Sequence, residues 1–292
     1  MRAAAAVEAA IRAATGEGFQ ITACRPVGGG CINLAYVIEG GGRRYFVKTN
    51  RAGLADMFGA EARGLAELES ARALRVPHPV ATGKSGDASF LVLEHLQLGG
   101  SGNWAELGVR LALQHRKTAD AFGWMRANTI GSTPQVNTWT ENWPSFLREY
   151  RLGPQLRLAA ENALGGRIQR LGHDLLGQLE AFFPGYAPLP SLLHGDLWGG
   201  NAAFTASGEP VVFDPAVYYG DREADLAMTE LFGGFGSAFY AAYRETWPPD
   251  PGHAARKNLY NLYHILNHAN LFGGGYVGRA EDMMQRLLAE LK

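Results

Sequence analysis

The sequence predicts an α+β fold of two lobes, a small strand-rich lobe followed by a larger helical lobe. Residues 19–50 contain segments in which apolar and polar residues alternate, separated by glycine clusters, and this pattern is typical of antiparallel strands. From about residue 104 onward the apolar residues recur mostly at helical spacing. The chain has 292 residues, enough for two cores, and we expect a nucleotide-binding lobe at 1–95 and a catalytic and substrate lobe at 96–292.

The elements of the small lobe are expected in the order helix, three strands, helix, two strands. The Ala-rich N-terminal segment has the composition of an amphipathic helix. Strands are predicted at 19–27, 32–40 and 43–50, a helix from about 53 to 74, and further strands near 80–83 and 89–94. The Gly-rich segment 96–104 is predicted to be the hinge, and a short strand-rich island at 191–213 interrupts the helices that follow.

Composition and charge exclude several classes of protein. Hydrophobic residues make up 47% and charged residues 19%, which is a globular composition. The net charge of −1 gives no support for a nucleic-acid partner or an anionic membrane surface. No apolar run approaches the roughly 18 residues of a membrane span. The two cysteines, Cys24 and Cys31, are too few for a disulfide framework and suggest a reducing cytosol, so a cytoplasmic location is expected.

The segment LLHGDLWGGN, followed by VVFDP, has the spacing of a phosphoryl-transfer loop. His194, Asp196 and Asn201 match the H-x-D-x-x-x-x-N pattern of kinases, and Asp214 follows a short apolar strand. In this interpretation Asp196 accepts the proton of the attacking hydroxyl, while Asn201 and Asp214 hold Mg²⁺. Taken singly, Asp196 could be an ordinary turn residue and Asp214 an ordinary strand end.

A glycine-rich loop precedes this segment in the chain. Gly28, Gly29 and Gly30 lie between two predicted strands, where glycines let the backbone approach a phosphate and offer it N–H groups. The loop is neither G-x-G-x-x-G nor a Walker A motif, and considered alone it is better explained as a hairpin turn.

Lys48 ends an apolar strand, as expected of the lysine that holds the α- and β-phosphates of a nucleotide. The alternative is a strand-end lysine whose amine extends into solvent. Glu61 lies near the start of the next predicted helix and is the preferred partner of Lys48, ahead of Glu67 and Glu69.

The strand FLVLEHL could carry the adenine site. Glu94 and Leu96 end it, and a core strand explains them equally well. Taken together and in this chain order, the parts predict an ATP- and Mg²⁺-dependent phosphotransferase. Pro-Ala follows Asp214 in place of Phe-Gly, and little room remains for an activation loop, so a small-molecule acceptor is favoured over a protein kinase.

Two pairs of polar residues in the large lobe have less specific interpretations. Asp221 and Asp225 are predicted to brace the catalytic loop. His264 and His268 stand four residues apart on one helical face, a spacing that occurs in zinc sites. The wall of a polar pocket, shared with Asn267 and Asn270, is the preferred interpretation.

Several longer segments together resemble the fructosamine kinase, or ketosamine-3-kinase, family over residues 18–290. They are VGGGCIN, FVK, LEHL, PQVNTWTENWPSFLREYRLGPQL, LLHGDLWGGN, FDPAVYYGDREADLAM and YHILNHANLFGGGY. The resemblance implies a protein kinase-like fold and ATP- and Mg²⁺-dependent phosphorylation of the O3 hydroxyl of a sugar joined to an amine by Amadori rearrangement. The 3-phosphate then falls apart and frees the amine, which is deglycation. Ribulosamines and erythrulosamines are expected to be better substrates than fructosamines.

The resemblance also assigns residues. It implies that Asp196 is the base, that Asn201 and Asp214 bind the metal and that Lys48 and Glu61 form the nucleotide pair. The residues expected at the sugar are Trp198, His264 and His268. Leu34-Ala35 departs from the more polar Glu-Gly that is common in the family. The acceptor is either a free ketosamine or a glycated protein.

Cys31 has two interpretations. Among the N–H dipoles of a phosphate loop its thiolate form would be favoured, and the resemblance suggests a redox switch through an intermolecular bond. The alternative is a small buried residue without chemistry. The protein is accordingly expected to be a monomer or a redox-sensitive dimer.

Three other functions compete with this interpretation. An aminoglycoside- or choline-type kinase would share the catalytic pattern but would need an acidic pocket for its cationic substrate. A nucleotide-binding scaffold without catalysis would be expected to lack one of the four key residues, and Lys48, Asp196, Asn201 and Asp214 are all present. A protein-binding module gains no support from the near-neutral charge.

Overall fold

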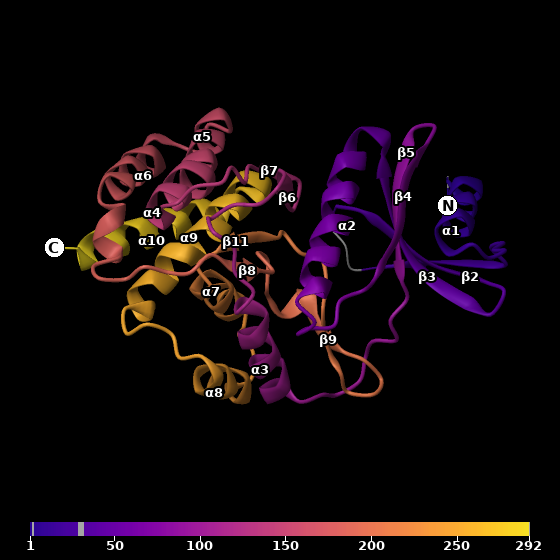
Figure 1. The fold of residues 1–292 in the computed structure, drawn as a ribbon. Helices are drawn as coiled ribbons and strands as arrows, with labels where there is room; N and C mark the ends of the chain where they lie inside the picture. The colour runs from indigo at the N-terminus through magenta and orange to yellow at the C-terminus, as the bar shows by residue number, and fades with distance from the viewer. Residues whose placement is uncertain (2, 29–31, 292) are drawn as a thin grey trace. The chain divides into compact units, whose positions relative to one another are not determined.

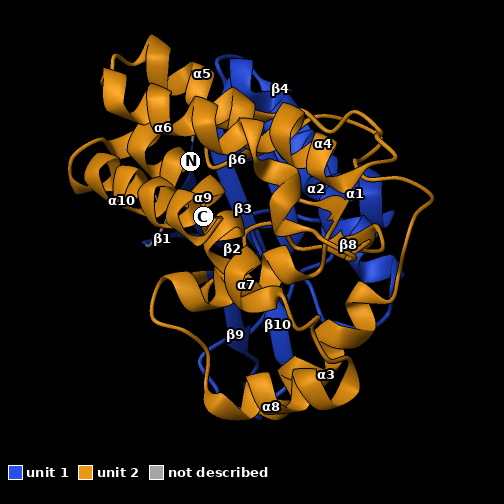
Figure 2. Cartoon of the chain, turned by 90° about the vertical axis from the view of Figure 1, so that its left-hand side faces the viewer, with its two compact units in different colours: residues 1–103, 201–216 blue, residues 104–200, 217–292 orange. Residues whose placement is uncertain are grey.

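The computed structural model describes residues 1, 3–28 and 32–291. By packing, the chain separates into two compact units (Figure 2). Unit 1 consists of residues 1–103 and 201–216, and unit 2 of residues 104–200 and 217–292. The chain therefore crosses between the units at both ends of the segment 201–216. The division of function at residue 95 remains a prediction.

Unit 1 is built on a five-stranded antiparallel sheet in the order β1-β2-β3-β5-β4. The strands are β1 (Ala23–Val27), β2 (Leu34–Gly40), β3 (Arg43–Arg51), β4 (Pro79–Ser85) and β5 (Ala88–Glu94). Helices α1 (Ala4–Thr15) and α2 (Ala55–Ser70) lie on opposite sides of this sheet (Figure 1). Val7 and Ile11 of α1 are fully buried against Val47, within one apolar cluster of the sheet. Because side chains alternate along a strand, the neighbouring Lys48 faces the other side of the sheet, where α2 lies.

The first strand and the second helix are shorter than predicted. The strand predicted from residue 19 begins at Ala23, because the backbone N–H of Ile21 donates to Glu8 of α1 at 2.7 Å and not to the sheet. The helix predicted to reach residue 74 ends at Ser70, and Arg72 then takes a left-handed φ of 55°. Unit 1 is completed by the hairpin of β9 (Ala202–Phe204) and β10 (Pro210–Val212), which adjoins Leu98 and Arg75 through isolated bridges.

Unit 2 is mainly helical and is organised around α9 (His253–Phe272), which is buried from Leu259 to Asn267. Helix α9 packs against three helices, α5 (Gly153–Glu161), α7 (Glu223–Leu231) and α10 (Gly275–Glu290). The other α-helices of this unit are α3 (Trp104–His115), α4 (Trp143–Leu147), α6 (Gly166–Gly177) and α8 (Ser237–Thr246). A short hairpin is formed by β6 (Asn128–Ile130) with β7 (Thr133–Gln135), and β8 (Ser191–Leu193) pairs antiparallel with β11 (Tyr218–Gly220), which lies further along the chain.

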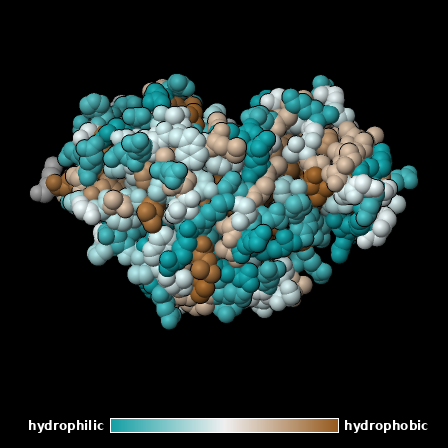
Figure 3. Space-filling view, in the orientation of Figure 1, coloured by the Kyte–Doolittle hydropathy of each residue, from teal (hydrophilic) through white to brown (hydrophobic). Residues whose placement is uncertain are grey.

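The predicted α+β composition, with a strand-rich and a helical part, is confirmed. The face shown in Figure 3 is mostly hydrophilic, with scattered apolar patches. Within the described part of the chain, none of the helices combines the length and the apolar character that crossing a bilayer requires.

Candidate active site

An ion-pair cluster of three residues lies on the α2 side of the sheet in unit 1. Lys48 of β3 contacts Glu61 of α2 at 2.6 Å and also contacts Asp214. The Lys48 and Glu61 side chains are only 7% and 11% exposed. Burial by itself would lower the pKa of Lys48, but the two carboxylates raise it above its ordinary value, so the amine remains a cation. The predicted partnership of Lys48 with Glu61 is present, and the rival Glu69 instead contacts His78.

Asp214 is placed by the end of β10 and by an unusual backbone conformation. Its φ is 58°, in the left-handed region that aspartate tolerates better than most residues. Its side chain contacts Lys48 but is 49% exposed, so the carboxylate remains accessible to a ligand.

Asn201 directly precedes β9 and lies beside Asp214 at the end of the same hairpin. In this antiparallel hairpin Ala202 pairs with Val212, and the Phe213 N–H donates to the Asn201 carbonyl oxygen at 3.1 Å. An amide oxygen and a carboxylate are suitable Mg²⁺ ligands, and Mg²⁺ commonly takes its remaining ligands from water and substrate phosphates. The described residues contain no group of three or more His, Cys, Asp or Glu that could hold a metal without such help.

Part of the glycine-rich loop can be described. Gly28 follows β1, whereas Gly29, Gly30 and Cys31 lie outside the described residues. The other end of the loop is anchored by the Asn50 amide, which donates to the Ile32 carbonyl oxygen at 3.0 Å and to Asn33 Oδ1 at 2.8 Å. Asn50 belongs to β3, so the same strand positions this end of the loop and Lys48.

Glu94 at the end of β5 is engaged within unit 1. Its N–H donates to the His78 carbonyl oxygen at 2.9 Å, and its carboxylate accepts hydrogen bonds from Arg75. An adenine ring could therefore not use this N–H, and the predicted adenine contact would depend on the residues just beyond it. Leu96, the second predicted adenine residue, is half-buried.

In unit 2 a buried carboxylate braces the turn that carries Asp196. Asp225 accepts hydrogen bonds from the N–H groups of His194 at 2.7 Å and Gly195 at 2.9 Å. It also contacts His115 Nε2 at 3.2 Å. Burial favours the protonated form of Asp225, but the contact with His115 and the backbone donor outweigh this effect and lower its pKa. The predicted bracing role is confirmed for Asp225, and Asp196 itself is half-buried on the turn.

Asp221, which was also predicted to brace this loop, binds elsewhere. It accepts hydrogen bonds from Tyr186 at 3.0 Å and from Tyr260 of α9. Asp221 therefore links α9 to the segment before β8, whereas Asp225 braces the catalytic turn.

Aromatic side chains form a surface next to the catalytic turn. Phe232 lies between Trp198, at 6.0 Å between ring centroids, and His268, at 5.0 Å. Phe272 and Tyr276 extend this surface beyond His268, at 5.6 and 5.0 Å. The indole of Trp198 lies so close to Gly200 that a Cβ at position 200 would come within 2.3 Å of the ring. These rings could pack against the apolar face of a sugar.

Most of the residues predicted to form a polar wall along α9 are buried or bound within unit 2, and their role at the sugar stays a prediction. Asn267 is 3% exposed and accepts a hydrogen bond from the Gln155 amide at 3.2 Å, whereas the amide of Asn270 donates to Gln155 Oε1 at 2.8 Å, so both serve the packing of α5. His264 is 6% exposed, and burial lowers its pKa to about 3, so its ring is neutral. His268 alone belongs to the aromatic surface. Phe232 was missed because a lone phenylalanine after a helix carries no sequence signal.

The chain is similar to known kinases over nearly its whole length. The family model described as fructosamine kinase matches residues 3–290. A probable ketoamine kinase of Synechocystis is 48% identical over 94% of this chain and 93% of its own length. A chloroplastic protein-ribulosamine 3-kinase of Arabidopsis thaliana is 45% identical over 95% of this chain and 86% of its own.

Solved structures agree with this result. A crystal structure named as a candidate fructosamine-3-kinase from Haemophilus somnus superposes with a TM-score of 0.89 at 29% identity, covering 97% of this chain and 96% of the other. An aminoglycoside phosphotransferase in complex with ADP and hygromycin B reaches a TM-score of 0.64 at 16% identity, covering 97% and 98%, and at that identity it shows the fold alone. The expected kinase-like fold is thus confirmed, and the chain belongs to the fructosamine kinase family.

Proposed function

We propose that this protein is a ketosamine 3-kinase. It transfers the γ-phosphoryl group of ATP to the O3 hydroxyl of a ribulosamine, erythrulosamine or fructosamine, and the unstable product then releases the amine. The observation that carries the proposal is that Lys48, Glu61 and Asp214 form one ion-pair cluster in a chain of this family. Such a cluster holds a lysine charged and fixed in direction, as phosphate binding requires.

The positions of the residues support a role for each of them in this proposal. Lys48 would hold the nucleotide phosphates, and Glu61 keeps its amine oriented. Asn201 and Asp214 would hold Mg²⁺, which when bound neutralises charge on the phosphates. Asp196 would accept the proton of the sugar hydroxyl and align its oxygen, from a turn whose backbone is held by Asp225.

The substrate class can be tested with one panel of acceptors. ATP consumption would be measured with ribuloselysine, erythruloselysine and fructoselysine, and with choline, homoserine and kanamycin as controls. We expect turnover of the ketosamines, best with the four- and five-carbon sugars, and little response to the controls. A site that binds sugar hydroxyls rejects acceptors that lack them, because its own polar groups then go unpaired. A preference for kanamycin or choline would contradict the proposed substrate but not the kinase chemistry.

A further inference from the structure

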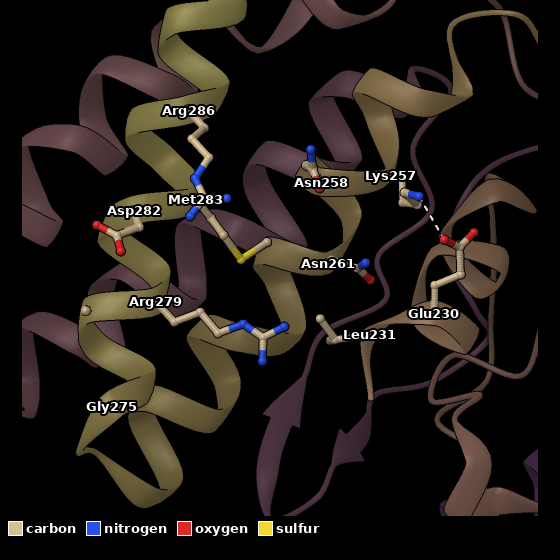
Figure 4. A pocket seen from close by; sticks show the side chains of 11 residues that line it. Glu230, Leu231, Lys257, Asn258, Asn261, Gly275, Arg279, Asp282, Met283 and Arg286 are labelled. Atoms are coloured by element: carbon tan, nitrogen blue, oxygen red, sulfur yellow. Dashed lines mark hydrogen bonds and ion pairs between the residues drawn. The ribbon is translucent and has the colours of Figure 1, made fainter. Parts of the chain in front are cut away.

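A pocket of about 630 Å³ opens in unit 2 between α7, α9 and α10 (Figure 4). None of its lining residues belongs to the ion-pair cluster or to the catalytic turn. The side chains that matter below are Arg279, Asp282 and Arg286 of α10, Asn261 of α9, and the ion pair between Lys257 and Glu230. These side chains include positive and negative charges, so the pocket is suited to a ligand that also carries a positive and a negative group.

Two arginines provide an unused anion site. Lys257 and Glu230 satisfy each other at 2.7 Å and add no net charge. Arg279 and Arg286 are exposed and form neither a hydrogen bond nor an ion pair with any residue that the structure describes. A guanidinium presents several N–H donors in one plane, which matches the two oxygens of a carboxylate.

The wall formed by α9 provides an unused acceptor. Asn261 is 6% exposed and lines the pocket, yet its Oδ1 has no hydrogen-bond partner among the described residues. A buried acceptor without a partner costs free energy, so a ligand that donates to it would be stabilised. Asp282 of α10 also belongs to the lining, but its carboxylate is directed away from Asn261 (Figure 4). The Asn261 acceptor suits an ammonium group as the arginines suit a carboxylate.

The pocket adjoins the aromatic surface through Arg279. The Arg279 guanidinium lies 5.9 Å from the centroid of Phe232, the ring that contacts Trp198 and His268. A ligand whose sugar lies against Trp198 could therefore place an aliphatic chain over Phe232 and bring its far end to Arg279. The side chain of lysine is an aliphatic chain of this kind, with an amine at one end and an α-amino acid group at the other.

We propose that this pocket binds the α-amino acid end of a ketosamine formed on the side-chain amine of a free amino acid such as lysine. The α-carboxylate binds Arg279 and Arg286, and the α-ammonium donates to Asn261 Oδ1. The inference rests on the proposed ketosamine kinase function and names its substrate as a free glycated amino acid. A lysine within a protein has peptide bonds in place of both charges and cannot use these contacts.

The test compares two acceptors that differ only at the α-carbon. One is free Nε-ribulosyl-lysine, and the other is the same compound with the amine acetylated and the carboxylate converted to an amide. We expect kcat/KM of the parent to be at least about tenfold higher for the free compound, since charge-assisted hydrogen bonds are lost on capping. In Arg279→Gln, and separately in Arg286→Gln, this ratio should fall toward one.

Arg170→Gln is the matched control. Arg170 is exposed on α6 of the same unit, away from the pocket lining, and forms no hydrogen bond or ion pair with a described residue. This variant should keep the parent's ratio. As a second measurement, free lysine should compete with the free ketosamine in the parent and lose this effect in Arg279→Gln.

The outcomes separate the inference from the function on which it rests. Equal kcat/KM for the free and capped compounds in the parent would overturn the inference and leave the kinase function standing. The same would follow if Arg279→Gln reduced both values in proportion, or if inorganic phosphate competed as well as lysine, because the pocket would then be a general anion site. Failure to phosphorylate any ketosamine would overturn both.

Discussion

The ion-pair cluster of unit 1 and the aromatic surface of unit 2 differ in how far their side chains are buried and paired. In the cluster, Lys48 is buried and paired with two carboxylates. On the aromatic surface, Trp198 is 38% and Phe272 60% exposed, and Arg279 nearby has no ion-pair partner among the described residues. Buried charges tolerate little change because an unpaired one is costly, whereas exposed rings tolerate substitution. The first region is suited to chemistry that is common to all substrates, and the second to selection among substrates.

The largest expected effect separates the two aspartates of the phosphoryl-transfer pattern. Asp196→Ala should reduce kcat by about a thousandfold or more while nucleotide affinity stays near that of the parent, because the base acts on the acceptor hydroxyl. Asp214→Ala should reduce kcat and also weaken binding of MgATP, because Asp214 is proposed to bind the metal. Titration of MgATP into each folded variant, followed by calorimetry, measures the difference. If both variants bind MgATP as the parent does, Asp214 is not a metal ligand.

The ion pair itself offers a test of stability against function. Lys48→Met should destabilise the protein by about 3–5 kcal/mol, because it leaves Glu61 buried without its cation. The double variant Lys48→Met/Glu61→Met replaces both charges by apolar groups and should recover much of that loss. Neither variant should phosphorylate a ketosamine at a rate near that of the parent. Denaturant unfolding and the ATP-consumption assay give the two readouts.

The double variant is also the control for the single one. Recovery of stability without recovery of activity would show that the charge of Lys48 acts on the substrate. Recovery of both would show that the pair serves only the fold, and the proposed contact with the nucleotide phosphates would then be wrong.

The contrast between the regions also explains what the sequence could predict. The partnership of Lys48 and Glu61 was predictable because strand alternation places Lys48 on one face and the next helix covers that face. The roles along α9 were not predictable in the same way. Helical spacing placed Asn267 and Asn270 near the two histidines, but only the packing of α5 shows that both asparagines contact Gln155. Arg279 reaches Phe232 because α10 and α7 both pack on α9, which no local pattern encodes.

Low pH should destabilise the folded protein through the buried part of α9. His264 has a folded-state pKa of about 3 against an ordinary value of 6.5, so the folded protein binds fewer protons than the unfolded chain between these values. Its contribution to stability is complete above pH 6.5 and is lost as pH falls toward 3. The loss should reach about 2 kcal/mol at pH 5.

Unfolding by urea at pH 7 and pH 5 measures this loss. His264→Asn should show a smaller decrease than the parent over the same interval, whatever its stability at pH 7. An equal decrease in parent and variant would mean that another buried group, such as His115, whose pKa burial also lowers, controls the response to acid.

The smallest effect is expected on the exposed aromatic surface, and it should fall on the acceptor alone. Trp198→Ala removes a ring that contacts Phe232 and is proposed to pack against the sugar, so KM for ribuloselysine should rise about tenfold. KM for ATP should not change, because Trp198 has no proposed contact with the nucleotide. Trp198→Phe should retain most of the affinity, since it keeps an aromatic face.

Phe272→Ala is the matched control, because Phe272 is more exposed and contacts His268 and Tyr276 but is not next to Trp198. It should change KM for the acceptor by less than about threefold. Steady-state kinetics with each substrate varied in turn distinguishes these effects. A rise of KM for ATP in Trp198→Ala would show that this ring supports the catalytic turn as a whole and not the sugar alone.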